Sequence, residues 1–112
     1  GTIKIMENLI KNYFTFFSKK DISSLDKLLA DNVKLIDWEI SANGKKEVLD
    51  ANKKIFSSFK SINVELKEIF IKDMTVVCLL EILVNNKDRI KVVDIIKFNN
   101  DNKIILISAF KQ

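Results

Sequence analysis

Three side chains of this sequence could take part in proton chemistry: Tyr13, Asp37 and Asp94. Asp94 is the most unusual, because it stands inside the apolar run Val92-Val93-Asp94-Ile95-Ile96. A carboxyl group among β-branched neighbours is costly to ionise, so we expect the run to carry it for a reason. The chain has no histidine, which is the commonest general base in proteins. Any catalysis must therefore rest on carboxylates, lysines or the tyrosine.

The composition fits one compact domain that covers residues 1–112. Of the 112 residues, 47% are hydrophobic, which allows a core of its own and leaves no room for a second domain. No apolar stretch is long enough to cross a membrane, and the N-terminus has no signal-peptide pattern. The sequence therefore predicts a soluble, cytoplasmic protein without a membrane partner.

The net charge of +4 is spread over the whole chain. The adjacent lysine pairs are Lys19-Lys20, Lys45-Lys46 and Lys53-Lys54, each beside acidic or polar residues. Nucleic-acid-binding domains gather their basic residues in a patch or a stripe. The lysines here indicate a solvated surface and no nucleic-acid partner.

The single cysteine, Cys78, excludes a disulfide within the chain. It lies in a strongly apolar segment with no histidine to activate it, so we interpret it as a small core residue. The lack of histidine also removes the commonest metal ligand. We expect no metal and no other cofactor.

The first part of the chain is typical of two helices. Apolar residues recur at helical spacing over residues 3–19, and Tyr13 lies on the buried side of this helix. Asp21 is a suitable N-cap for a second, short helix that ends near Asp31-Asn32.

A strand and a third helix follow. In the strand Val33–Trp38, alternation places Asp37 on the same face as Val33 and Leu35. Asn43-Gly44 is a turn before the third helix. The apolar stripe of that helix consists of Val48, Ala51, Ile55, Phe56 and Phe59.

The rest of the sequence predicts four antiparallel strands. The first begins at Ile62, and its apolar phase switches near Lys67-Glu68, which indicates a bulge or a sharp bend. The other strands are predicted over residues 74–84, 90–98 and 104–110, with turns at 85–88 and 99–102. The expected fold class is α+β, with three helices packed in a curved, mostly antiparallel sheet.

The whole chain resembles the cone-shaped domain shared by nuclear transport factor 2, the SnoaL-type polyketide cyclases and the ketosteroid isomerases, a fold also described as cystatin-like. One matching segment is Leu9–Asp37, including the spacing from Tyr13 to Asp37 and the Ala30-Asp31-Asn32 segment. The second is the strand Val92–Phe98 around Asp94, and the third is Lys103-Ile104 followed by Ala109-Phe110.

The resemblance implies a role for each of the three side chains. In that family the residue matching Asp37 is the general base that moves a proton between carbons of an enone. Those matching Tyr13 and Asp94 donate hydrogen bonds to the enolate oxygen, a division of roles for which ketosteroid isomerase is a standard example. Apolar neighbours favour the neutral, donating form of Asp94, whereas Asp37 is expected to be solvated and ionised. The implied pocket holds a small hydrophobic molecule and is lined by Phe17, Trp38, Phe56, Val92 and Ile96.

Each of the three residues also has a structural interpretation. Tyr13 could be a core tyrosine whose hydroxyl bonds a neighbour. Asp37 could end its strand by accepting backbone donors, and Asp94 could pair with a lysine.

Three classes of function follow from the sequence. The first is an enzyme of carbonyl-assisted proton transfer, either an isomerase or a cyclase. The second is a non-catalytic ligand-binding domain, and the third is a protein-interaction module that uses the outer face of the sheet. We also expect a homodimer through that face, because the segments 74–84 and 104–110 are apolar on both sides.

Overall fold

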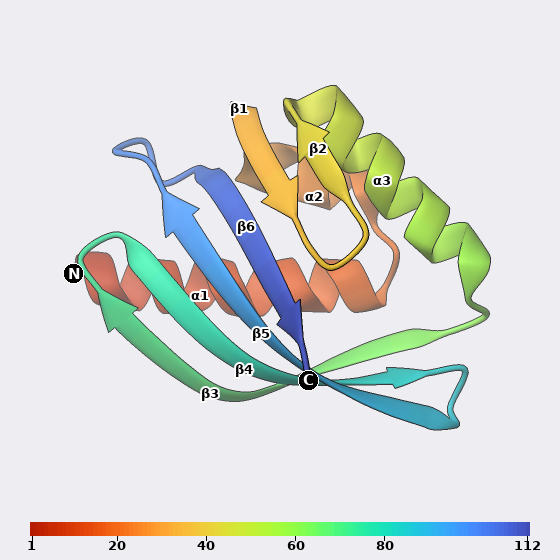
Figure 1. Cartoon of the computed structure of the whole chain (residues 1–112). Coiled ribbons are helices and arrows are strands. Elements are labelled where there is room, and N and C mark those ends of the chain that lie inside the picture. Colours follow the sequence, from red (N-terminus) through yellow and green to blue (C-terminus); the bar gives the residue numbers. More distant parts are fainter.

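The computed structural model describes all 112 residues as three helices and one six-stranded sheet (Figure 1). The elements are α1 (Thr2–Ser18), α2 (Ile22–Leu28), β1 (Leu29–Ile36), β2 (Ser41–Asn43), α3 (Lys45–Ser58), β3 (Ile62–Lys72), β4 (Thr75–Val84), β5 (Asp88–Phe98) and β6 (Ile104–Lys111). The strands lie in the order β2-β1-β6-β5-β4-β3. All neighbours are antiparallel except β1 and β6, which are parallel. The predicted α+β class with a curved, mostly antiparallel sheet is confirmed.

The long strands β3, β4 and β5 curve past α1, while α2 and α3 lie beside β1 and β2 (Figure 1). The register of β3 against β4 shifts between Leu66 and Glu68, which confirms the predicted bulge. A bulge increases the local bend and twist of a strand. The curved sheet and the helices therefore enclose a space in which side chains of both can meet.

Helix α1 lies along the concave side of the sheet. Its buried residues, spaced one, three or four positions apart, are Met6, Ile10, Tyr13 and Phe14. At its end, the Ser18 hydroxyl donates to the carbonyl of Phe14 at 2.8 Å and accepts from the backbone N–H of Val64 at 2.9 Å. The hydroxyl therefore joins the end of α1 to the edge strand β3. None of the three helices is long and apolar enough to span a membrane.

Helix α2 begins where the sequence predicts and ends earlier. The Asp21 carboxylate accepts from the Ser24 backbone N–H at 3.1 Å and from its hydroxyl at 2.7 Å, so the predicted N-cap is confirmed. The expectation that the helix reaches Asp31-Asn32 is wrong. Leu29 already pairs with Ile104 of β6, so the residues after Leu28 belong to the sheet.

The short strand β2 is not predicted by the sequence. It pairs antiparallel with Lys34–Ile36 of β1, and three residues are too few to show an alternating pattern. Gly44 follows it with φ of 86° and forms the N-cap of α3. This conformation favours glycine, and it confirms the predicted turn at Asn43-Gly44.

The buried face of α3 differs from its predicted stripe. The buried residues are Val48, Leu49, Asn52 and Phe56, whereas Ala51, Ile55 and Phe59 are half-buried. The Lys20 ammonium group holds the end of this helix. It donates to the backbone carbonyls of Phe56 at 2.7 Å, of Phe59, and of Lys60 at 3.3 Å. The connection between α1 and α2 is thereby fastened to the C-terminal end of α3.

Candidate functional site

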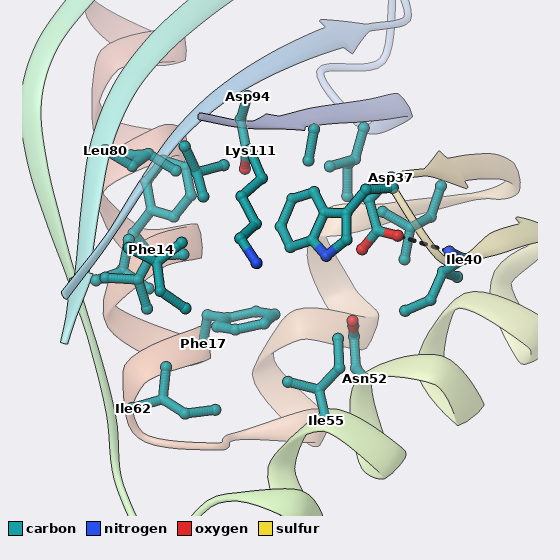
Figure 2. Close-up of a pocket in the computed structure, with 18 of the residues that line it drawn as sticks. Phe14, Phe17, Asp37, Ile40, Asn52, Ile55, Ile62, Leu80, Asp94 and Lys111 are labelled. Atoms are coloured by element: carbon teal, nitrogen blue, oxygen red, sulfur yellow. Dashed lines mark hydrogen bonds between the residues drawn. The ribbon is translucent and has the colours of Figure 1, made fainter. Parts of the chain in front are cut away.

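A cavity of about 330 Å³ lies between α1, α3 and the concave face of the sheet (Figure 2). Seventeen of its 22 lining residues are hydrophobic. Its five other lining residues are Asp37, Glu39, Asn52, Asp94 and Lys111. Because so few polar groups line it, each of them has a strong influence on what the cavity can bind.

Asp94 reaches the cavity from the middle of β5. Its register partners, Cys78 and Ala109, lie on the two neighbouring strands, and the residue is 7% exposed. Burial, and after it the charge of Asp37, raise the pKa of Asp94 to about 7. No ion pair involves Asp94, so the alternative of a lysine partner does not apply.

Tyr13 lines the same cavity from α1. Its ring packs edge-on against Phe14, with a centroid distance of 5.1 Å, and lies 6.1 Å from the Phe17 ring. Burial, together with nearby Asp94 and Cys78, raises the pKa of Tyr13 far above its ordinary value. The phenol therefore stays neutral and can donate a hydrogen bond.

The thiol of Cys78 remains neutral as well, because burial and the neighbouring Asp94 raise the pKa of Cys78 to about 12. The side chain is fully buried, as expected for a small core residue. No cluster of three or more histidine, cysteine, aspartate or glutamate side chains could hold a metal ion.

Asp37 stands directly after β1, where the chain turns toward β2. Its Oδ1 accepts from the backbone N–H of Glu39 at 2.8 Å. It also accepts from the backbone N–H of Ile40 at 2.6 Å (Figure 2). Its own N–H donates to the carbonyl of Ile40 at 2.9 Å. These bonds fix the turn and hold the carboxylate against the cavity. They involve Oδ1 and leave Oδ2 available to a ligand.

The model of the SnoaL-like domain family matches residues 10–107 of the chain. The chain belongs to this family. No curated protein sequence matches it.

Three solved structures place this SnoaL-like domain among proteins of the same fold. A proposed SnoaL-like polyketide cyclase from Shewanella denitrificans OS-217 has a TM-score of 0.86 at 12% identity, with 96% of this chain and 90% of that chain covered. A proposed ketosteroid isomerase from Kribbella flavida DSM 17836 has a TM-score of 0.85 at 12% identity, with 97% of this chain and 78% of that chain covered. A de novo designed protein with a curved β-sheet has a TM-score of 0.83 at 14% identity, with 97% of this chain and 86% of that chain covered. At these identities the likeness concerns the fold alone.

The SnoaL-like domain has three of the five expected wall residues on its cavity: Phe17, Trp38 and Val92. Ile96 and Phe56 do not line it. Ile96 is fully buried in β5, and the Phe56 ring packs against Phe17 of the cavity wall, with a centroid distance of 4.8 Å. Trp38 is 48% exposed, and Lys111 Nζ lies 5.9 Å from its ring centroid. Trp38 and Lys111 therefore stand at an open side of the cavity.

Three further polar residues of the SnoaL-like domain line the cavity without having been predicted: Glu39, Asn52 and Lys111. Asn52 projects from α3 and Lys111 from the end of β6 (Figure 2). Sequence signals for both exist. Asn52 lies four residues from both Val48 and Phe56 on the buried side of α3. Lys111 follows Ile107 and Ala109 in two-residue steps, and all three line the cavity.

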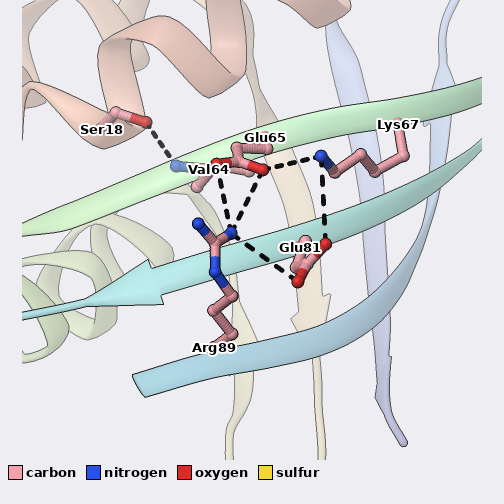
Figure 3. A network of polar contacts seen from close by, with 6 residues as sticks. All are labelled: Ser18, Val64, Glu65, Lys67, Glu81 and Arg89. Carbon is pink, nitrogen blue, oxygen red and sulfur yellow. Dashed lines mark hydrogen bonds and ion pairs between the residues drawn. The ribbon is translucent and has the colours of Figure 1, made fainter. Parts of the chain in front are cut away.

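The outer face of the sheet carries exposed aromatic rings and a group of ion pairs. Phe70 and Phe110 are each 55% exposed. Nearby, Glu65 on β3 stands opposite Glu81 on β4 (Figure 3). Like charges in this position repel each other, and two basic side chains lie between them. Lys67 lies 2.8 Å from the Glu65 carboxylate and 3.9 Å from that of Glu81. Arg89 lies 3.3 Å from the Glu65 carboxylate and 3.7 Å from that of Glu81.

Proposed function

We propose that this protein binds a small hydrophobic carbonyl compound and catalyses proton transfer on it, as an isomerase or a cyclase. The observation that carries the proposal is that Tyr13, Asp37 and Asp94 line one largely apolar cavity. Two of them can donate hydrogen bonds, and the third carries a free carboxylate oxygen. These are the groups that enolate chemistry requires.

In the proposed reaction, Oδ2 of Asp37 removes a proton from the carbon next to the ligand's carbonyl group. The electrons of that C–H bond form a C=C bond, and the carbonyl oxygen becomes an enolate oxygen. Tyr13 and Asp94 donate hydrogen bonds to this oxygen. In an isomerase, Asp37 returns the proton to a different carbon of the ligand, further from the carbonyl group. In a cyclase, the enolate carbon attacks a second carbonyl group, whose oxygen then takes the proton.

In this proposal, the burial of Tyr13 and Asp94 increases the rate of proton transfer. Hydrogen-bond donors stabilise a developing negative charge more strongly in a dry site than in water, because few water dipoles screen them. Asp94 is a donor only while it is protonated. With its pKa at about 7, catalysis should decline as the pH rises through that value.

The test is exchange of α-protons on a ketone in D₂O, followed by NMR with 2-tetralone as the probe. A second probe, 3-cyclohexenone, reports isomerisation through the absorbance of the conjugated enone. Both reactions should be accelerated by the wild-type protein, and Asp37→Asn should abolish the acceleration. If the wild-type protein accelerates neither, the proton-transfer proposal is refuted.

One observation favours a second candidate function, non-catalytic ligand binding. The two hydrogen bonds that Oδ1 of Asp37 accepts give this residue a structural reason to be present. In that case the cavity holds its ligand, and Tyr13 and Asp94 orient it. Binding of 2-tetralone without proton exchange would support this candidate over the enzyme.

We also propose a homodimer through the outer face of the sheet. Phe70 and Phe110 expose aromatic surface there, and burying it against a second copy is favourable. The neighbouring ion-pair group has two acidic and two basic side chains, so this group itself carries no net charge.

A further inference from the structure

Asn52 is a buried polar residue with an unbonded donor. It is 2% exposed, and its Nδ2 has no hydrogen-bond partner. Leaving a buried amide donor unpaired is destabilising, because water satisfied that group in the unfolded chain. Asparagine is also a weaker helix former than leucine in a helix interior. The stability of the fold alone therefore does not explain Asn52.

The position of Asn52 points to a ligand. Val48 and Phe56, one turn away on either side, are apolar and buried, whereas Asn52 lines the cavity. Figure 2 shows its side chain projecting from α3 into the cavity. Rotation of the terminal amide exchanges its donor and acceptor ends, so the group can offer either end to a ligand.

Most of the wall of this cavity is apolar. Ile40, Ile55 and Phe59 contribute apolar walls to the same cavity. A hydrophobic ligand that displaces water from such a cavity would leave the Asn52 amide unpaired unless the ligand brings an oxygen atom to it.

We propose that Asn52 determines specificity by hydrogen-bonding a second oxygen of the ligand. The ligand class is then a small, mainly hydrophobic molecule with two oxygen functions, such as a hydroxy ketone or a diketone. This inference rests on the proposed function in one respect: Tyr13 and Asp94 bind the first oxygen.

The test compares 2-naphthol with the 1,5-, 2,6- and 2,7-dihydroxynaphthalenes by calorimetric titration. The three diols place the second hydroxyl at different distances from the first. For the wild-type protein, the best diol should bind about tenfold more tightly than 2-naphthol, as expected for one added hydrogen bond. The two equivalent orientations of a symmetric diol raise its affinity only about twofold, which is less than the expected tenfold difference.

The deciding variant is Asn52→Leu, which keeps a similar volume and removes both polar atoms. It should lose the preference for the diol and bind 2-naphthol as before. Its melting temperature without ligand should be unchanged or higher, because an unpaired buried donor is removed. Lys53→Met, on the exposed side of the same helix, is the control and should keep the preference.

A second readout uses the wild-type protein. In ¹⁵N NMR, the Asn52 side-chain amide signals should shift on addition of the best diol and much less with 2-naphthol. This measurement stands even if Asn52→Leu does not fold.

Four results would overturn the inference: no binding of any probe to the wild-type protein, no diol preference beyond twofold, a preference that survives in Asn52→Leu, or a lower melting temperature of that variant. All four are measured without turnover. If the diol preference depends on Asn52 but the protein shows no proton exchange, only the proposed reaction is refuted and this inference stands. Activity without the preference refutes this inference only.

Discussion

Asp37 and Asp94 line the same cavity, and the charge of Asp37 adds to burial in raising the pKa of Asp94 to about 7. The two carboxyl groups differ in their surroundings. Asp37 accepts two backbone hydrogen bonds at a turn, while Asp94 lies within the sheet without an ion-pair partner. Such a difference lets one carboxyl group act as a base while the other acts as a hydrogen-bond donor.

Replacing Asp37 by asparagine should separate catalysis from binding. The asparagine Oδ1 can still accept from the N–H groups of Glu39 and Ile40, so the turn is kept. The basic oxygen is lost, and proton exchange on 2-tetralone should fall by orders of magnitude while its affinity changes little. Glu39→Gln, a second cavity carboxylate, is the control. Equal loss of activity in both variants would contradict the assignment of the base to Asp37.

Asp94 should make the stability of the protein depend on pH. Its pKa is raised from the ordinary 3.8 to about 7, so the unfolded state loses this proton first as the pH rises. The contribution of Asp94 to the free energy of unfolding therefore falls between about pH 4 and pH 7 and levels off above that range. At about 1.4 kcal/mol per pKa unit, the decrease is on the order of 4 kcal/mol.

Asp94→Asn should remove this decrease, so the variant should gain stability over wild type as the pH increases. Urea unfolding at pH 4.5, 6 and 8 measures the effect. Asp101→Asn, an exposed carboxyl in the turn between β5 and β6, should leave the pH dependence as it is. A wild-type stability that rises from pH 4.5 to 8 in parallel with that of Asp94→Asn would show that Asp94 is not protonated in the folded state.

Tyr13→Phe should lower turnover without removing it. The variant loses one of two donors to the enolate oxygen, a loss of about 3 kcal/mol in transition-state stabilisation, or on the order of 100-fold in rate. The affinity for 2-tetralone should change less than the rate. Steady-state kinetics and titration on the same samples provide the comparison, and an unchanged rate would assign Tyr13 to the core alone.

The sequence was sufficient to predict which faces Tyr13 and Asp94 occupy. Helical spacing and strand alternation decide which side chains point inward, and both patterns are long enough in α1 and β5 to be read locally. The end of α2 and the strand β2 depend instead on pairing with distant segments. Leu29 joins the sheet because Ile104 pairs with it, and no local pattern contains that information.

The part of the cavity lined by α3 was harder to predict. Asn52 breaks an apolar stripe, and sequence analysis treats such a break as part of a solvated face unless the burial of the helix is known. Ile96 and Phe56 show the opposite problem. Both are buried as expected, but whether a buried side chain lines a cavity or packs behind it depends on its three-dimensional neighbours.

Phe110→Glu should convert the proposed dimer to a monomer. The ring is 55% exposed on the outer face, and a charge there would have to be buried without a partner in the interface. Light scattering at micromolar concentration should give twice the chain mass for wild type and the chain mass for the variant. Ile3→Glu, at a 61% exposed position of α1, should remain a dimer. A monomeric wild type would refute the proposed dimer.

Lys20→Met should destabilise the fold through the end of α3. The ammonium group donates to three backbone carbonyls, those of Phe56, Phe59 and Lys60, and methionine cannot replace these bonds. Hydrogen bonds from a charged donor to helix-end carbonyls contribute net stability, so the loss should be about 1–3 kcal/mol. Urea unfolding measures it.

Lys19→Met is the matched control for this prediction. Lys19 is the preceding residue, carries the same charge and is exposed, so its replacement should change the free energy of unfolding by less than about 0.5 kcal/mol. The loosened end of α3 carries Ile55 and Phe59 of the cavity wall. Lys20→Met should therefore also weaken the binding of 2-tetralone, whereas Lys19→Met should not. Equal stability of the two variants would mean that the three bonds contribute nothing net.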